Sequence, residues 1–302
     1  MKPTEIIIEL NKSCNLNCEF CYHKNMNNLI LNYDKVIKII DDIKQSKIKA
    51  VRFTGGEPLL RKDLIKILKY SKEKGLYTIL NTNGTLITPE NIHLFNYVDL
   101  VLISFHYLKN FKKIINALNI LKNKNITIMI ATILIKKNIK DLQIFYKNIF
   151  SITNKNFKEW ILLRPIPGTK DELKFENVDE LFSKIKKYNK IYHLNAKISN
   201  SIPFCSNEVY AKNLCRGGKF DCGRTRLMID VYGNYKLDYS IDKIYGNVDS
   251  NSILDIWNLK ELRNIRSDKL VENVCKKCEF LNKCRGGFLF KETLNKKLND
   301  KK

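Results

Sequence analysis

The sequence lacks any long hydrophobic run. No stretch of about eighteen uninterrupted apolar residues, the length that spans a bilayer, occurs in its 302 residues. The first apolar run, Ile6-Ile7-Ile8, is also too short for the core of a secretory signal peptide. We therefore expect a cytoplasmic protein with no membrane partner. The first predicted strand begins at Glu5, so we expect no N-terminal leader-binding domain, and a separate protein would supply that recognition.

Acidic residues are scarce: 31 Asp and Glu against 54 Lys and Arg give a formal net charge of +23. An excess of positive charge attracts acidic partners, including nucleic acids. The lysines, however, are spread along the predicted amphipathic helices, and no dense basic run with interleaved aromatic residues occurs. We interpret the charge as solvated helix faces and expect no nucleic-acid partner. A non-catalytic adaptor that binds zinc or a cluster and docks nucleic acid is the alternative from another class.

Cysteine is absent from the middle of the chain, since none occurs between Cys21 and Cys205. The nine cysteines therefore form two separate groups. An odd number of clustered thiols, with no secretion signal, favours metal or redox chemistry over a disulfide framework. The N-terminal group is Cys14, Cys18 and Cys21, and the C-terminal group is Cys205, Cys215, Cys222, Cys275, Cys278 and Cys284.

Short apolar runs alternate with amphipathic segments over residues 4–164. The runs are continuous, as in parallel strands covered on both faces, and segments such as residues 111–118 have apolar residues at helical spacing. Six such units predict an α/β fold, a partial (β/α)6 TIM-like barrel whose last unit is closed by a helix at Val178–Ile191. The predicted strands are residues 5–10, 50–54, 77–81, 100–104, 127–133 and 160–163.

After about Asn195 the composition changes, and cysteines, glycines and turn signals become frequent. Residues 227–237 are typical of a hairpin, and a short helix follows at about residues 252–266. We predict a barrel domain over residues 1–195 and a small cysteine-rich auxiliary domain over residues 196–302. Such a loop-rich domain needs metal to fold.

Two motifs follow the first two predicted strands. Cys14, Cys18 and Cys21 have C-x3-C-x2-C spacing, and Gly55-Gly56-Glu57-Pro58 ends the second strand. Three thiolates can hold an iron–sulfur cluster and leave one iron open to chelate the amino and carboxylate groups of a substrate. A tetrahedral zinc site with His23 as its fourth ligand is the competing interpretation. Both motifs lie at carboxyl ends of strands, where the sites of such barrels assemble.

These motifs resemble those of the radical S-adenosylmethionine (SAM) superfamily. The resemblance implies that the three cysteines bind a [4Fe–4S] cluster, that SAM is cleaved to a 5′-deoxyadenosyl radical, and that this radical abstracts hydrogen from a substrate. It implies an electron donor of the flavodoxin or ferredoxin type. The glycines would let the backbone approach the SAM amino group, and Glu57 would hold the loop or that ammonium. Further residues expected around the cluster and SAM are Tyr22, Pro58, Asn81, Asn83, Ser104, Thr132 and Arg164.

The chain departs from the family pattern after Ser104. Many relatives continue with Leu-Asp-Gly, whereas this sequence has Phe105-His106-Tyr107. The usual acid is missing, and we expect His106 to line the substrate pocket.

The C-terminal run Cys275-x2-Cys278-x5-Cys284-Arg-Gly-Gly resembles the SPASM/twitch extension of radical SAM enzymes, which carries one or two auxiliary [4Fe–4S] clusters. In that pattern Cys222 and Gly233 fit, with Cys215 as an extra ligand. Asp238 stands where the cysteine after the hairpin is expected, and Phe288 replaces the last cysteine of the run.

Six thiols cannot complete two all-cysteine clusters. The three cysteines of the C-terminal run would share one cluster, and Cys215 and Cys222 would hold another with Cys205 or Asp238. Asp238 is otherwise a solvated turn residue. A zinc site built on the C-terminal thiols is the alternative.

Cys205 lies outside the auxiliary pattern, and three roles compete for it: a cluster ligand, an inert buried thiol, or a hydrogen-atom donor to a substrate radical. The resemblance implies modification of a ribosomally made peptide by crosslinking, epimerisation or oxidation. Radical oxidation or epimerisation of a small molecule such as a sugar is the alternative.

Overall fold

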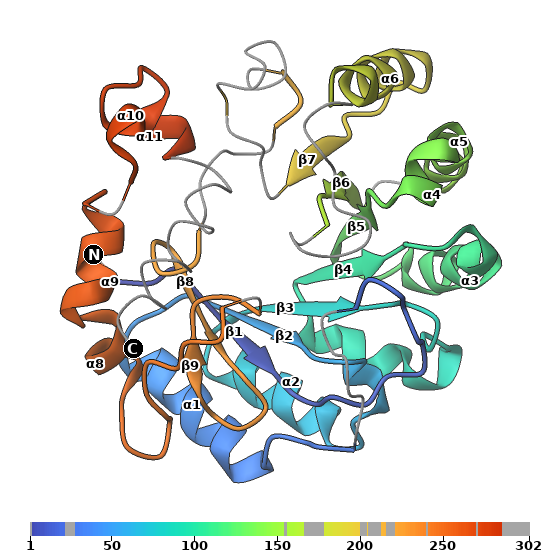
Figure 1. Ribbon diagram of the computed structural model, residues 1–302. Coiled ribbons are helices and arrows are strands. Elements are labelled where there is room, and N and C mark those ends of the chain that lie inside the picture. Colours follow the sequence, from blue (N-terminus) through green and yellow to red (C-terminus); the bar gives the residue numbers. More distant parts are fainter. Residues whose placement is uncertain are drawn as a thin grey trace. The chain divides into compact units, whose positions relative to one another are not determined.

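The computed structural model describes residues 2–21, 28–153, 156–165, 178–199, 204, 213–215, 221–239, 241–269 and 271–285 (Figure 1). Tyr22, His23, Cys205 and Phe288, which the sequence singled out, lie outside the described residues. The chain divides into two compact units, described in turn below. Unit 1 comprises Met1–Ser104, Lys113–Ile128 and Asp221–Ser267, and unit 2 comprises Phe105–Lys112, Met129–Phe220 and Asp268–Lys302.

Unit 1 is built on a largely parallel sheet. Neighbouring strands pair in parallel, except that the last strand is antiparallel to the one before it. The strands are, in spatial order, β4 (Leu100–Ser104), β3 (Tyr77–Thr82), β2 (Ala50–Thr54), β1 (Glu5–Glu9), β8 (Arg226–Ile229) and β9 (Tyr235–Lys236).

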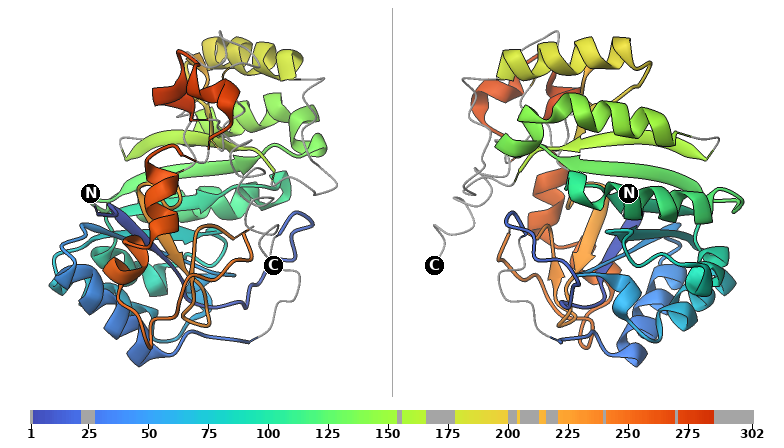
Figure 2. Two further views of the ribbon diagram at one scale, coloured as in Figure 1. Left: turned by 60° about the vertical axis from the view of Figure 1, so that its left-hand side comes forward. Right: turned by 90° about the vertical axis from the view of Figure 1, so that its right-hand side faces the viewer.

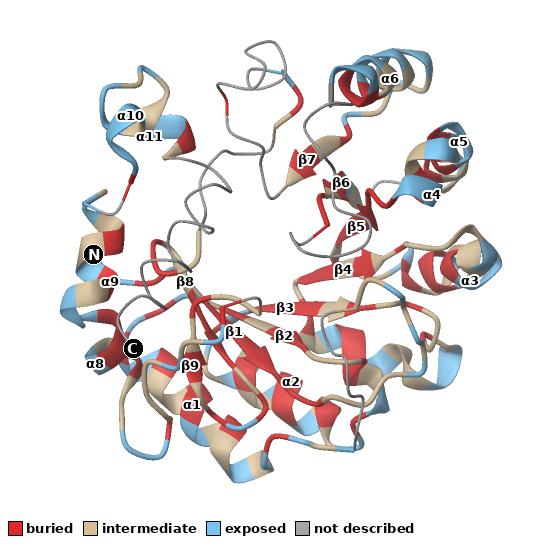
Figure 3. Ribbon diagram, in the orientation of Figure 1, coloured by how far each residue is buried: buried red, intermediate tan, exposed pale blue. Residues whose placement is uncertain are grey.

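The core of unit 1 lies between these strands and the helices packed on them. Ile6, Val51 and Phe53 have no exposed surface. In helix α1 the buried residues recur at helical spacing, so one face of the helix is apolar, and Figure 3 shows buried and exposed faces on the same helices. Continuous apolar strands covered by amphipathic helices are the arrangement expected of a parallel α/β sheet.

The helices of unit 1 follow its strands in sequence. Two of them, α1 and α2, contact each other (Figure 2). Tyr70 of α2 donates a 2.8 Å hydrogen bond to Asp41 of α1. The helices are α1 (Tyr33–Gln45), α2 (Leu64–Glu73), α8 (Ile253–Trp257) and α9 (Lys260–Arg266), with α3 (Phe111–Leu121) mainly in this unit and 3-10 helices at Pro58–Leu60 and Pro89–Tyr97.

Unit 2 contains the next strands and helices. β6 (Phe157–Leu163) pairs in parallel with β7 (Lys197–Ser199), and β5 (Thr127–Ile133) has its first two residues in unit 1 and the rest in unit 2. The predicted closing helix is confirmed as α6 (Val178–Ile191). The other helices are α4 (Lys136–Lys140), α5 (Leu142–Ile152), α10 (Asn273–Lys276), α11 (Leu281–Cys284) and a 3-10 helix at Leu108–Asn110.

The predicted strands and the α/β class are confirmed, but the predicted hairpin has a different setting. Its first strand, β8, pairs in parallel with β1, from Glu5 opposite Arg226 to Ile8 opposite Ile229. Residues 221–267 therefore belong to the same compact unit as the N-terminal strands. The division into domains over residues 1–195 and 196–302 stays a prediction. No helix in the described part of the chain is long and apolar enough to cross a bilayer.

Candidate functional site

The three N-terminal cysteines lie on the loop after β1, here called the cysteine loop (residues 11–21). All three thiols are partly buried. Cys21 N donates to Cys18 O at 3.0 Å, which closes a turn, and Leu16 N donates to the Cys14 thiol at 3.4 Å. Burial raises the pKa of Cys14, while the Leu16 donor acts in the opposite direction.

The cysteine loop is fixed by the turn at residues 55–58, here called the GGEP turn. Gly56 N donates to Asn11 O at 2.7 Å, and Glu57 N donates to Ser13 O at 2.8 Å. A Cβ atom on Gly56 would lie 2.2 Å from Ser13 O, and one on Gly55 would lie 2.5 Å from Asn11 O. The backbone of the cysteine loop therefore occupies the space of both missing side chains. The sequence predicted close approach of SAM here, and the structure shows close approach of the cysteine loop.

Asn11 is a buried organiser of this junction that sequence reasoning missed. Its side chain is 1% exposed, and its amide nitrogen donates to Ser13 O at 3.1 Å, Ser13 Oγ at 3.0 Å and Glu57 O at 3.0 Å. Buried N–H donors are almost always hydrogen-bonded, and this amide nitrogen meets that requirement. Its place directly after an apolar strand and before the first cysteine was the available signal.

Arg61 is a second missed residue. Its Nη1 donates to Leu10 O at 3.0 Å and Leu31 O at 2.7 Å, so it fastens the start of the cysteine loop to the chain that follows it. A two-bond pair with Asp63, at 2.5 and 2.9 Å, orients the guanidinium. The signal was the Arg-x-Asp pair that begins three residues after Pro58.

Glu57 is a fully buried carboxylate that joins the GGEP turn to the end of β3. Oε1 accepts hydrogen bonds from Leu59 N at 3.1 Å and Thr82 Oγ1 at 2.7 Å, and Oε2 accepts one from Asn83 N at 2.7 Å. Burial raises the pKa of Glu57 to about 6, against the lowering effect of these three donors. These three hydrogen bonds hold the GGEP turn against the end of β3.

We expect Glu57→Gln to lower the free energy of unfolding by about 1–3 kcal/mol. A carboxamide has one acceptor oxygen, so in either orientation its NH2 faces a donor, at Asn83 N or at Leu59 N. Urea unfolding at pH 7 measures the difference. Glu73→Gln, at an exposed Glu in an i,i+4 pair with Lys69, is the matched control and should change stability by less than about 0.5 kcal/mol. Equal stability of the wild type and the Glu57 variant would contradict this role.

The two asparagines predicted at the end of β3 have different neighbours. Asn83 Nδ2 donates to Asn15 Oδ1 at 2.8 Å and lies 3.9 Å from the Cys14 thiol, so the structure brings it to the cysteine loop. Asn81 Oδ1 instead accepts from Arg52 Nη1 at 3.0 Å, and Arg52 pairs with Glu5. Ser104 lies at the end of β4 and is partly buried.

In unit 2, Thr132 and Arg164 are both buried. The Thr132 hydroxyl donates to Phe105 O at 2.8 Å and accepts from Trp160 Nε1 at 3.0 Å, so two protein groups use it. Arg164 follows β6, and its backbone N–H donates to Ser199 O at 3.4 Å. Both positions are buried, and their contact with a cofactor stays a prediction.

His106 has a defined tautomer. Its Nδ1 accepts a hydrogen bond from Ile133 N at 3.2 Å, and its backbone oxygen accepts from Asn138 Nδ2 at 2.9 Å. Burial lowers the pKa of His106 to about 4. The ring is therefore neutral at pH 7, and the proton is on Nε2, which can donate a hydrogen bond.

This depressed pKa predicts a loss of stability in mild acid. Below the unfolded-state pKa of about 6.5 the unfolded chain binds a proton that the folded chain does not bind, so stability falls as pH drops toward 4. We expect His106→Gln to remove up to roughly 3 kcal/mol of the stability difference between pH 7 and pH 4. Unfolding free energies at several pH values measure it. His93→Gln, at an exposed histidine, is the control and should keep the pH dependence of the unfolding free energy seen in the wild type. The same pH dependence in the His106 variant would contradict its origin in His106.

The C-terminal cysteines fall into different surroundings. In unit 1 the Cys222 thiol lies 3.9 Å from Asp238 Oδ2, so the predicted ligands Cys222 and Asp238 are neighbours. In unit 2, Cys215 packs instead against a buried cluster that includes Cys284. That Cys215 and Cys222 share a cluster stays a prediction. Cys275 and Cys278 are partly buried.

The thiols of the cysteine loop and of the C-terminal run are donors of the kind that iron–sulfur clusters bind. Among the residues that the structure describes, no three His, Cys, Asp or Glu side chains converge as the ligands of one metal ion do. In a four-iron cluster each thiolate binds a different iron, so the ligands surround a cube and need not converge. Half-buried thiols on a loop held by its backbone suit that requirement.

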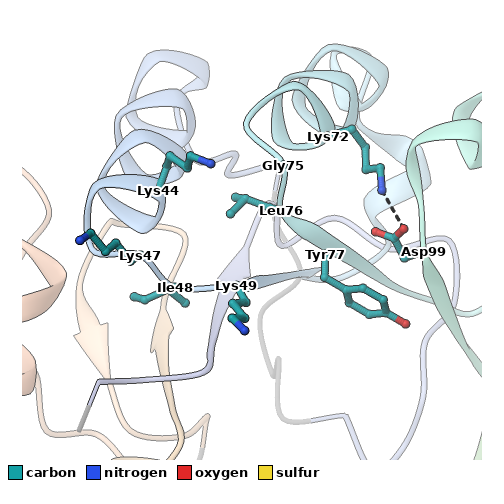
Figure 4. Close-up of a pocket in the computed structure, with 9 residues that line it drawn as sticks. All are labelled: Lys44, Lys47, Ile48, Lys49, Lys72, Gly75, Leu76, Tyr77 and Asp99. Carbon is teal, nitrogen blue, oxygen red and sulfur yellow. Dashed lines mark hydrogen bonds and ion pairs between the residues drawn. The ribbon is translucent and has the colours of Figure 1, made fainter.

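One pocket lies away from this site, beside the amino ends of β2 and β3 (Figure 4). Its volume is about 590 Å³, and its lysines include Lys49 and Lys72, the latter paired with Asp99 at 2.7 Å. The cysteine loop and the GGEP turn follow the carboxyl ends of strands. The pocket therefore does not belong to the candidate site.

Comparison with protein families gives two matches. The model of the radical SAM superfamily matches residues 8–149, and that of the SPASM iron–sulfur cluster-binding domain matches residues 221–279. The first match contains the three N-terminal cysteines, and the second contains Cys222, Cys275 and Cys278. Cys215 and Cys284 lie outside both matches.

Three relatives illustrate the sequence similarity. An AdoMet-dependent heme synthase of Methanosarcina barkeri is 23% identical over 94% of this chain and 90% of its own length. An uncharacterized protein of Methanocaldococcus jannaschii is 30% identical, over 61% of this chain and 71% of its own. A PqqA peptide cyclase of Bradyrhizobium diazoefficiens is 31% identical over 30% of this chain, which spans about a quarter (24%) of that relative.

Solved structures show the same fold. SuiB of Streptococcus suis bound to S-adenosylmethionine has a TM-score of 0.72 at 18% identity, over 95% of this chain and 73% of that one. The anSMEcpe structure with bound AdoMet has a TM-score of 0.72 at 19% identity, over 94% and 85%. The fold is thus the α/β radical SAM fold, an unclosed barrel of parallel strands. The radical SAM match implies a [4Fe–4S] cluster with SAM, and the SPASM match implies auxiliary iron–sulfur clusters. This chain belongs to the radical SAM superfamily and carries a SPASM-type iron–sulfur domain.

Proposed function

We propose that the chain binds its [4Fe–4S] cluster through Cys14, Cys18 and Cys21 and acts on a ribosomally made peptide. The observation that carries the first part is the docking of the cysteine loop on the GGEP turn, with two backbone hydrogen bonds and no room for a side chain on Gly56. Three thiolates for four irons leave one iron for the amino and carboxylate groups of SAM.

The bound cluster and SAM would supply an electron transfer that splits the sulfonium and yields a radical able to abstract hydrogen from the substrate. The chain's own residues provide rigidity. Glu57 fixes the GGEP turn against β3, and Asn83 ties the end of β3 to the cysteine loop. Neutral His106, whose Nδ1 accepts from Ile133 N, would line the substrate pocket.

Two comparisons support a peptide substrate. The SuiB structure bound to precursor peptide SuiA has a TM-score of 0.73 over 95% of this chain, and the PqqA peptide cyclase shares local sequence identity. The modification would be a crosslink, an epimerisation or an oxidation. An acidic flavodoxin or ferredoxin would suit the net charge of +23 as the electron donor.

An anaerobic assay tests both parts of this proposal. The reconstituted protein, given SAM and dithionite, should form 5′-deoxyadenosine. With a deuterated candidate peptide, deuterium should be found in the 5′-deoxyadenosine. No 5′-deoxyadenosine at all would favour the non-catalytic adaptor. Turnover without deuterium transfer from peptides would keep the radical chemistry and reject the peptide.

A small-molecule substrate is the second candidate. The heme synthase aligns over nearly the whole of both chains, whereas the peptide cyclase aligns over a short segment. The same deuterium assay with labelled tetrapyrroles or sugars would identify such a substrate. Transfer from one of these, and none from peptides, would establish this alternative.

A further inference from the structure

The last three cysteines are gathered on two short helices of unit 2. Cys275 lies in α10, Cys284 ends α11, and Cys278 lies in the turn between them. Cys278 N donates to Cys275 O at 3.2 Å, and Cys284 N donates to Phe280 O at 2.8 Å. This compact arrangement supplies three thiols, and a four-iron cluster has a fourth iron to be bound.

A fourth thiol lies in the same unit. Phe204 and Cys284 form a buried cluster, against which Cys215 and Phe280 pack. The backbone holds Cys215 in place, because its segment forms a parallel bridge with Ile198, whose N–H donates to Leu214 O at 2.8 Å.

We propose that Cys215 is the fourth ligand of one auxiliary [4Fe–4S] cluster, completed by Cys275, Cys278 and Cys284. Each thiol gives up its proton to bind iron, so four protons leave as the cluster enters. The rings of Phe204 and Phe280, with centroids 5.9 Å apart, form an apolar wall that limits access of water to it.

The proposed cluster does not include Cys222. It belongs to unit 1, where its thiol contacts Asp238 and lies in a charged environment with Arg226. The resemblance to the auxiliary pattern pairs Cys215 with Cys222, whereas within unit 2 Cys215 packs against the cluster that contains Cys284. The proposal rests on the auxiliary clusters that the SPASM domain implies and is independent of the substrate.

The test measures iron in a background without the radical cluster, Cys14, Cys18 and Cys21 all changed to Ala. After reconstitution with ferric iron, dithiothreitol as reductant and sulfide, this background should hold about four irons per chain with a [4Fe–4S] Mössbauer spectrum. Adding Cys215→Ala should reduce the iron to about three per chain or fewer. Cys222→Ala is the matched control and should keep the four irons. Near-ultraviolet circular dichroism checks the fold.

If the Cys215→Ala protein fails to fold, Cys215→Ser decides, because it keeps the volume of the side chain. A hydroxyl ligand should change the Mössbauer parameters of one iron in four. Unchanged iron and spectrum in the Cys215 variants, loss of the cluster in Cys222→Ala, or zinc with no iron in the background protein would each overturn the proposal. None of these readouts depends on 5′-deoxyadenosine, so failure here is distinguishable from failure of the proposed function.

Discussion

Changing Cys14, Cys18 and Cys21 together to Ala is expected to abolish 5′-deoxyadenosine formation, a loss of at least about a thousand-fold. The proposed ligands are removed together, so no partially ligated cluster should remain. Iron in the reconstituted protein should fall by about four per chain. Anaerobic turnover with dithionite, followed by chromatography of the nucleoside product, measures the loss.

The triple variant should remain folded. The cysteine loop is fastened through backbone atoms of Asn11 and Ser13 and through Arg61, none of which is changed. Thermal unfolding and circular dichroism should therefore resemble those of the wild type. A folded triple variant with wild-type turnover would reject the cluster assignment, and an unfolded one would contradict the backbone anchoring described here.

Much of unit 1 could be predicted because its signals are local. Residues 50–54 and 100–104 are short, mostly apolar segments, and both strands have the predicted limits. The position of the cysteine loop follows from the same rule, since carboxyl ends of parallel strands share one edge of a sheet.

The surroundings of β8 were not predictable in this way. Its residues, Arg226–Ile229, have the pattern of a buried strand, but strand pairing joins residues far apart in the chain. The partner of Ile229 is Ile8, and no local pattern connects them. The same holds for Thr132, whose hydroxyl is used by Trp160 across the packed core. A polar residue near a strand end can face the rim or the core, and one step of register decides between them.

The GGEP turn shows how a motif can be located correctly and its reason assigned incompletely. Glycine is typical of close backbone approach, and the sequence predicts that approach at Gly55 and Gly56. The neighbour that comes close is the carbonyl of Ser13, which only the folded chain reveals. Outside the cysteines, we therefore expect a substitution at Gly56 to have the largest effect on the rate of 5′-deoxyadenosine formation.

Gly56→Ala is expected to slow 5′-deoxyadenosine formation about a hundred-fold. The new Cβ would lie 2.2 Å from Ser13 O and 2.6 Å from Lys12 O, both backbone atoms that no rotamer change can move. The cysteine loop must therefore shift by roughly 1 Å, a displacement of the size that costs two orders of magnitude in rate. Overpacking should also lower the unfolding free energy by about 1–3 kcal/mol.

Gly75→Ala is the matched control for this substitution. Its Cβ would meet only Lys44 Nζ, at 3.7 Å, and its φ of +75° imposes a backbone penalty of about 1–2 kcal/mol. The two variants should thus lose similar stability, while only Gly56→Ala loses turnover and cluster iron. Gly75 precedes the amino end of β3, whereas the cysteine loop and the GGEP turn follow the carboxyl ends of strands. A comparable loss of turnover in both variants would therefore mean that general destabilisation, and not displacement of the cysteine loop, is responsible.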